Sequence, residues 1–129
     1  MTPLRALCLA TAGLLLAGCA TGYHYSELRG QRYFKAPIDT YPVIISKVDG
    51  KSTPIGGPVL VDPGQRAVTL QGPPGGAGKR NVDEVTLNMD VKPCTRYYIV
   101  AVKDNALNVD FKPKVDYEES IAGCTPPAK

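Results

Sequence analysis

Beyond Tyr41 the chain breaks into short β-branched stretches, each stopped after a few residues by Gly, Pro or Asp. Val, Ile and Tyr favour strands, and turn residues recur at a spacing of about 8–12 residues, which is typical of sandwiches and barrels. Asp49-Gly50 favours a tight hairpin turn, and Asp62-Pro63-Gly64 supplies a second turn. The sequence therefore predicts an all-β domain, either a small antiparallel β-sandwich or a small barrel.

Alternation of apolar and polar residues places the individual strands. The apolar stretch 95–102 is predicted as a central strand, with Tyr97 and Tyr98 on opposite faces of the sheet. The stretch 72–81 is rich in Gly and Pro and is predicted as an exposed loop. The predicted strands cover 41–48, 53–55, 58–61, 66–71, 85–91, 95–102 and 107–111, with a stop at Pro113, and 115–124 is a last strand or one helical turn.

The first 18 residues have the three regions of an export signal: Arg5, an apolar run over 6–17, and a small-residue exit at Gly18. This run is too short to span a bilayer. Leu16-Ala17-Gly18-Cys19 resembles the lipobox of bacterial lipoproteins. The resemblance implies cleavage before Cys19, a diacylglyceryl group on its thiol and acylation of its freed amine. Through these acyl chains a membrane becomes the expected partner.

Ala20 follows the cysteine where Asp would commonly mark retention in the inner membrane. The resemblance therefore implies the bacterial cell envelope, at the periplasmic leaflet of the outer membrane. No strand or helix period appears up to Lys35, so 19–35 is predicted as the lipidated cysteine and a flexible tether, with the β-sandwich domain over 36–129. An ordinary secretory signal cut near Ala20 is the alternative.

The four cysteines sort by position. Cys8 leaves with the signal, and Cys19 is the lipidated residue. Cys94 and Cys124 remain, and in an oxidising periplasm such a pair forms a disulfide. Closing a loop of about 30 residues stabilises the fold by about 3–4 kcal/mol. A redox-active pair is the alternative reading, although it would normally use a C-x-x-C spacing, which is absent.

A second resemblance covers roughly residues 43–102. Val48-Asp49-Gly50-Lys51, followed by the run from Val59 to Leu70 with its Pro-Gly turn, resembles the PEGA-type or carboxypeptidase-regulatory-like β-sandwich repeats. Those modules occur on bacterial surface and periplasmic proteins and are mostly structural or interaction units. The resemblance implies a β-sandwich without catalytic activity.

The predicted domain contains few residues that could carry out catalysis. The single histidine, His24, precedes it, so a Ser-His-Asp arrangement cannot be built. Adjacent carboxylates such as Glu118-Glu119 point to opposite faces of a strand. The segment ending in Lys79 and Arg80 lacks the hydroxyl that a phosphate-binding loop needs after its lysine. We expect no enzyme activity and no cofactor, metal or nucleotide, and a net charge of +3 is too small for nucleic-acid binding.

These observations predict a lipid-anchored envelope lipoprotein, a non-enzymatic structural or interaction module with an envelope protein partner. Two alternatives stay open. One is a ligand-binding or enzymatic domain acting on cell-wall saccharide or peptide, and the other is an accessory subunit of an envelope secretion or surface assembly. The candidate contact residues are Arg96, Tyr97, Tyr98, Lys79 and Arg80.

Overall fold

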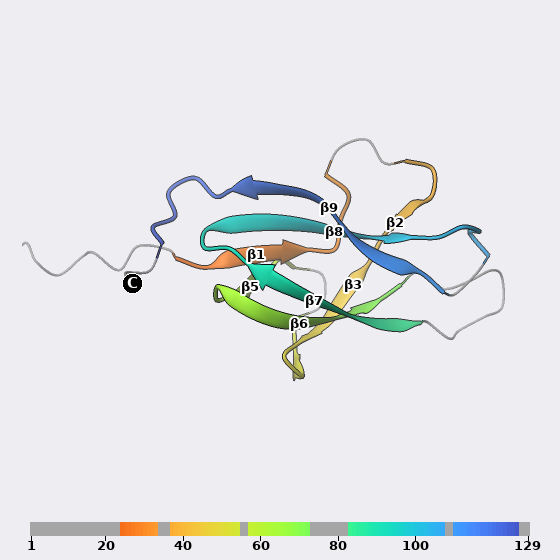
Figure 1. Cartoon of the computed structure of the whole chain (residues 1–129), viewed down its shortest axis with the longest axis horizontal. Helices are drawn as coiled ribbons and strands as arrows, with labels where there is room; N and C mark the ends of the chain where they lie inside the picture. The colour runs from red at the N-terminus through yellow and green to blue at the C-terminus, as the bar shows by residue number, and fades with distance from the viewer. Residues whose placement is uncertain (1–23, 34–36, 55–56, 73–82, 108–109, 127–129) are drawn as a thin grey trace, which may run out of the picture.

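A computed structural model gives the fold and describes residues 24–33, 37–54, 57–72, 83–107 and 110–126. These residues form nine strands and no helix, arranged as two sheets (Figure 1). The prediction of an all-β sandwich is confirmed. The strands are β1 (Ser26–Arg29), β2 (Thr40–Pro42), β3 (Ile44–Val48), β4 (Lys51–Ser52), β5 (Val59–Val61), β6 (Gly64–Gln71), β7 (Glu84–Val91), β8 (Thr95–Val102) and β9 (Lys112–Ser120).

Strand β8 is the centre of the five-stranded sheet, as its apolar sequence predicts. On one side β9 pairs with it antiparallel over its whole length. On the other side β1 runs parallel to its first half, and β2 runs antiparallel to its second half. Strand β5 pairs with β1 and ends this side of the sheet. Among the described strands, β1 and β8 form the parallel pair in an otherwise antiparallel fold.

The four-stranded sheet has the order β4-β3-β6-β7, with every neighbour antiparallel. The longest ladder of this sheet joins β6 and β7 and runs from the pair Gly64 and Val91 to the pair Gln71 and Glu84. The predicted strands 66–71 and 85–91 correspond to these two. Short connections at 62–63 and 92–94 carry the chain from one sheet to the other.

The predicted single strand 41–48 is wrong, because it divides between the two sheets. Strand β2 belongs to the five-stranded sheet and β3 to the four-stranded one, so the chain crosses between them at Val43. At the crossing, the Val43 N–H donates to the Gly30 carbonyl at 2.9 Å. A Cβ on Gly30 would lie 1.9 Å from the Val43 oxygen, so the two backbones approach this closely only because residue 30 is glycine.

The turn between β3 and β4 has the predicted chemistry. Asp49 and Gly50 both have positive φ, 50° and 80°, as a two-residue hairpin turn requires. The Asp49 carboxylate accepts the Ala67 N–H at 2.9 Å and pairs with Arg66 at 3.0 Å. The backbone hydrogen bond first, and the arginine second, hold the pKa of Asp49 below its ordinary range. The side chain thus fastens the hairpin to β6.

The core lies between the facing sides of the two sheets. Every second residue of β6 faces it, which explains the alternating apolar pattern of that strand, and Tyr97, Ile99 and Ala101 enter it from β8. Its buried members are Leu28, Val43, Ile45, Val59, Val61, Val68, Leu70, Met89, Val91, Tyr97, Ile99, Ala101 and Phe111.

The predicted tether is wrong for its later part, because β1 lies inside it. Ser26 and Leu28 are fully buried, and β1 sits between β8 and β5. Only one apolar residue marks this four-residue strand, which is too little for a periodic pattern. The folded part therefore begins before residue 36. Residues 1–23, including the signal and Cys19, lie outside the described residues.

The C-terminal strand also differs from its prediction. The stretch 107–111 is not a strand where the structure describes it, and Leu107 is exposed. Strand β9 instead runs through Pro113, which was predicted to stop a strand. Because β9 has a hydrogen-bonded neighbour on one side only, a residue without an N–H is tolerated there. The predicted 58–61 corresponds to the shorter β5, whereas the prediction of a strand at 53–55 is wrong where the structure describes it, because β4 ends at Ser52.

Candidate binding surface

The outer face of the five-stranded sheet, which points away from the core, gathers a cluster of aromatic and charged side chains. The register of the strands brings these side chains together. Glu27 and Arg29 of β1 lie beside Arg96 and Tyr98 of β8, respectively. On the other side of β8, Tyr98 pairs with Tyr117 and Arg96 with Glu119 of β9. We call the outer-face cluster Glu27, Arg29, Tyr33, Arg96, Tyr98, Tyr117 and Glu119.

Three tyrosines form its aromatic part. Tyr33, four residues after β1, stacks on Tyr117 with ring centroids 3.9 Å apart and an interplanar angle of 17°. The same ring meets Tyr98 edge-on at 5.1 Å. Tyr98 is 8% exposed, whereas Tyr33 and Tyr117 are 45% and 42% exposed. Two tyrosines are therefore open to solvent above a third that is buried beneath them.

Arg96 links both carboxylates of the cluster. Its Nε donates to Glu27 Oε2 at 2.8 Å, and its Nη1 donates to Glu119 Oε1 at 2.9 Å. These hydrogen bonds, the one to Glu27 being the stronger, raise the pKa of Arg96 above its ordinary range. Arg29 adds a longer contact to Glu27 at 3.3 Å, and its guanidinium carbon lies 6.0 Å from the Tyr98 ring centroid. The ion pairs use two of the three nitrogens of Arg96 and one oxygen of Glu119.

Tyr98 joins the aromatic part of the cluster to the charged part. Its hydroxyl donates to Glu119 Oε1 at 3.0 Å. Burial first, and this hydrogen bond second, raise the pKa of Tyr98. The opposite effect appears at Glu119, where the hydrogen bonds from Arg96 and then Tyr98 lower the pKa of the carboxyl. Glu119 is accordingly ionised at neutral pH.

Tyr97 faces the other way. Its ring is 2% exposed in the core, and its hydroxyl accepts the Lys92 N–H at 2.8 Å. Of the five candidate contact residues, Arg96 and Tyr98 belong to the cluster, whereas Tyr97 is a core residue. Lys79 and Arg80 lie outside the described residues.

The sequence alone did not point to Tyr33 or Tyr117. Tyr33 was included in the predicted tether, and Tyr117 comes into register with Tyr98 through an irregularity in β9, where the pairing steps from Tyr117 directly to Val115. The one usable signal was alternation at the chain end, since Tyr117 and Glu119 share a face of a strand.

The predicted disulfide between Cys94 and Cys124 is present. It joins the β7–β8 connection to the segment after β9 and closes a loop with a sequence separation of 30 residues. The Ile121 N–H donates to the Cys94 carbonyl at 2.9 Å beside it. Both contacts fix the C-terminal segment to the end of the sandwich where β8 begins.

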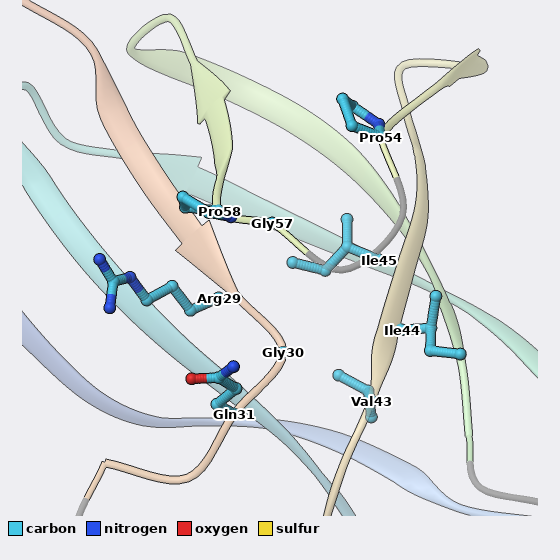
Figure 2. A pocket seen from close by; sticks show the side chains of 9 residues that line it. All are labelled: Arg29, Gly30, Gln31, Val43, Ile44, Ile45, Pro54, Gly57 and Pro58. Carbon is cyan, nitrogen blue, oxygen red and sulfur yellow. The ribbon is translucent and has the colours of Figure 1, made fainter.

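Two hollows lie away from the cluster. One, of about 200 Å³, sits where the chain crosses between the sheets, and Figure 2 shows Ile45 reaching into it while Ile44 points away. It is smaller than the pockets that usually hold a small-molecule ligand. The other, of about 560 Å³, opens between the β3–β4 hairpin and β5, where Arg66 is paired with Asp49.

The described part of the chain contains no group of three His, Cys, Asp or Glu side chains arranged to hold a metal ion. Within the same residues, no helix has the length and apolar character needed to cross a membrane. No family model, curated protein or solved structure matches the chain. The functional proposals therefore depend on the residues and on their geometry.

Proposed function

We propose that this chain is a lipid-anchored lipoprotein of the bacterial envelope, held at the periplasmic leaflet of the outer membrane through acyl chains on Cys19. The observation that carries the proposal is Leu16-Ala17-Gly18-Cys19 at the end of a short apolar run. The Cys94–Cys124 disulfide supports it, since such bonds persist in oxidising compartments such as the periplasm.

The anchor is tested by labelling. The full chain is expressed in a bacterium grown with radiolabelled palmitate, next to the Cys19→Ser variant. Label is expected in the wild type and not in the variant, because the thiol is the acceptor. Label in Cys19→Ser, or none in the wild type, rejects the anchor. Cys8→Ser is the matched control, because Cys8 lies within the proposed signal and its loss leaves labelling unchanged.

The sandwich serves, in this proposal, as a binding module with an envelope partner and not as an enzyme. The charges of the outer-face cluster support this, because Arg96 is paired with two carboxylates and the pKa of Glu119 is lowered. A general acid at neutral pH needs a raised carboxyl pKa instead. Two half-exposed tyrosines beside these charges form a surface suited to contact.

A second candidate function is binding of cell-wall saccharide at the outer-face cluster. The observation that favours it is the stacked pair of Tyr33 and Tyr117, open to solvent and flanked by Arg96 and Glu119. An exposed aromatic ring can pack on the apolar face of a sugar, while neighbouring charged groups hydrogen-bond its hydroxyls.

This candidate is tested by co-sedimentation of the detergent-solubilised full chain with purified peptidoglycan sacculi. Tyr117→Ala is expected to weaken binding about tenfold, since an aromatic contact contributes about 1 kcal/mol or more. Tyr25→Ala is the matched control, because Tyr25 is exposed but lies outside the cluster. Equal binding by both variants rejects the outer-face cluster as the saccharide site, and no binding by the wild type rejects saccharide as the ligand. In-cell cross-linking followed by purification then identifies a protein partner of an envelope assembly.

A further inference from the structure

The start of β1 is fixed to one end of the sandwich. Ser26 is fully buried, and its hydroxyl donates to the Lys92 carbonyl at 2.5 Å. The same oxygen accepts the Thr95 N–H at 3.1 Å. Ser26 therefore bridges the connection between β7 and β8 on both sides of Cys94, and the chain cannot enter the fold at another place.

Several other segments meet at this end, which we call the N-terminal end. Val61 pairs with Ser26, so the turn from β5 to β6 at Asp62-Pro63-Gly64 lies here. The Cys94–Cys124 disulfide holds the last described segment beside them. In Figure 1 the start of β1 and the segment after β9 lie together at the left.

The opposite end is one strand length away. Strand β8 runs eight residues from Thr95 to Val102, which is about 23 Å. Strand β6 ends there and β7 begins, since Gln71 pairs with Glu84. A Cβ on Gly72 would meet the Phe111 ring at 2.6 Å, so the two sheets come together at this end too. The turn after β8, with Asp104, is exposed here.

Only a short length of chain connects the proposed anchor to the N-terminal end. Ser26 is the seventh residue after Cys19. Seven residues span at most about 25 Å when fully extended, and about 15 Å on average as a flexible chain. The distance of about 23 Å between the two ends of the sandwich exceeds the average reach and is close to the maximum, so the anchor restricts which end approaches the lipid.

The N-terminal end also carries side chains suited to a headgroup surface. Tyr25 is 37% exposed, and the His24 ring lies 4.2 Å from it. Rings with an apolar body and a polar tip favour the boundary between hydrocarbon and water. Lys92 is exposed at the same end and pairs with Glu118. The two rings lie one and two residues before β1, on the chain that leads to Cys19.

From the short connection and the fixed position of Ser26, we infer that the N-terminal end faces the phospholipid headgroups, with Tyr25 and His24 at the contact, and that the end with Asp104 points away from the bilayer. This inference rests on the proposed acylation of Cys19. It places the outer-face cluster on the side of an upright domain, with Glu27 and Arg96 nearest the lipid.

The test uses the full chain, acylated in bacteria and reconstituted into vesicles of phosphatidylethanolamine and phosphatidylglycerol that contain headgroup spin-labelled lipid. Gln65→Cys places a fluorescent thiol label at the N-terminal end, and Asp104→Cys places the same label at the other end; both positions are exposed. We expect the spin label to quench fluorescence several-fold more strongly at residue 65 than at residue 104.

A lengthened variant serves as the matched control. An insertion of about 20 Gly and Ser residues after Ala20 raises the average reach to about 30 Å, so the difference between the two labels should largely disappear. Equal quenching at both positions with the natural connection, or stronger quenching at residue 104, overturns the orientation.

Flotation of the vesicles separates the two proposals. If the wild type floats with lipid and Cys19→Ser does not, the anchor is present, and equal quenching then refutes only the orientation. If the wild type does not float, the proposed anchor fails and the orientation fails with it.

Discussion

Tyr97 and Tyr98 are neighbours in β8, yet their side chains belong to different environments. Tyr97 points into the core, where its hydroxyl oxygen accepts a hydrogen bond from the backbone N–H of Lys92. Tyr98 points to the outer face, where it lies against Tyr33 and donates to a carboxylate. Both rings are almost completely buried, but apolar side chains cover the first, and aromatic and charged ones surround the second.

The difference shows how one strand can serve stability and binding together. The core face needs only apolar side chains of suitable volume, because the hydrophobic effect is non-directional. The outer face needs particular partners at particular register positions, because ion pairs such as Arg96 with Glu119 depend on geometry. Changes on the core face should therefore act on folding, and changes on the outer face mainly on binding.

The largest effect is expected on the core face of β1. Leu28→Ala removes a fully buried side chain, which costs about 2–5 kcal/mol of the free energy of unfolding. Arg29→Ala, one residue later on the outer face, should cost about 1 kcal/mol or less, because its ion pair is partly exposed. Urea denaturation measures both. Equal losses would mean that β1 does not separate the two faces.

The next effect concerns the crossing where the chain passes from the five-stranded to the four-stranded sheet. Gly30→Ala forces a Cβ against the Val43 carbonyl, and overpacking of this kind costs about 1–3 kcal/mol or more. Gly57→Ala is the control, because a Cβ there meets no atom within 4 Å. An equal change of the melting temperature in both variants would contradict the close approach of the two backbones at Gly30.

The sequence predicted what depends on local pattern. Apolar alternation located β6 and β7, the apolar and β-branched content of 95–102 located β8, and Asp49-Gly50 located the hairpin turn, because all three signals are properties of neighbouring residues. The disulfide was predicted from the expected oxidising compartment and from the two cysteines that remain after Cys8 and Cys19 are assigned to the signal and the anchor. None of these required knowledge of distant pairing.

Features that depend on distant pairing were missed. Strand β1 has one apolar residue, and its identity as a strand comes from pairing with β8 and β5. The split of 41–48 into β2 and β3 reflects partners in two different sheets. The outer-face cluster joins Tyr33, Tyr98 and Tyr117, which come together only through the register of β9 and the path after β1. Arg96 and Tyr98 were predicted as contacts, but their partners were not.

A smaller effect compares the two tyrosine hydroxyls. Tyr97→Phe leaves the partly buried Lys92 N–H without its acceptor, which should cost about 1 kcal/mol. Tyr98→Phe should cost less, because the Glu119 carboxylate keeps Arg96 and reaches water. Chemical denaturation of both variants measures the order. A larger loss for Tyr98→Phe would make the outer face the more important hydrogen-bonding site.

The smallest effect is the contribution of Glu119 to acid stability. The pKa of this carboxyl is lower in the folded protein, because Arg96 and then Tyr98 donate to the ionised form. The folded state thus binds fewer protons than the unfolded one, so the stabilisation is complete above the ordinary pKa of a glutamate and is lost as pH falls through the lower, folded value. Glu119→Gln should reduce the slope of melting temperature against pH in this acid range. At neutral pH it should remove only the contribution of the ion pair.

The pKa of Asp49 is also lowered in the folded protein. Asp49→Asn should therefore remove a separate and additive part of the acid dependence, since Asp49 lies beside the other sheet. An unchanged acid slope in Glu119→Gln would show that solvent screens the ion pair between Glu119 and Arg96 completely.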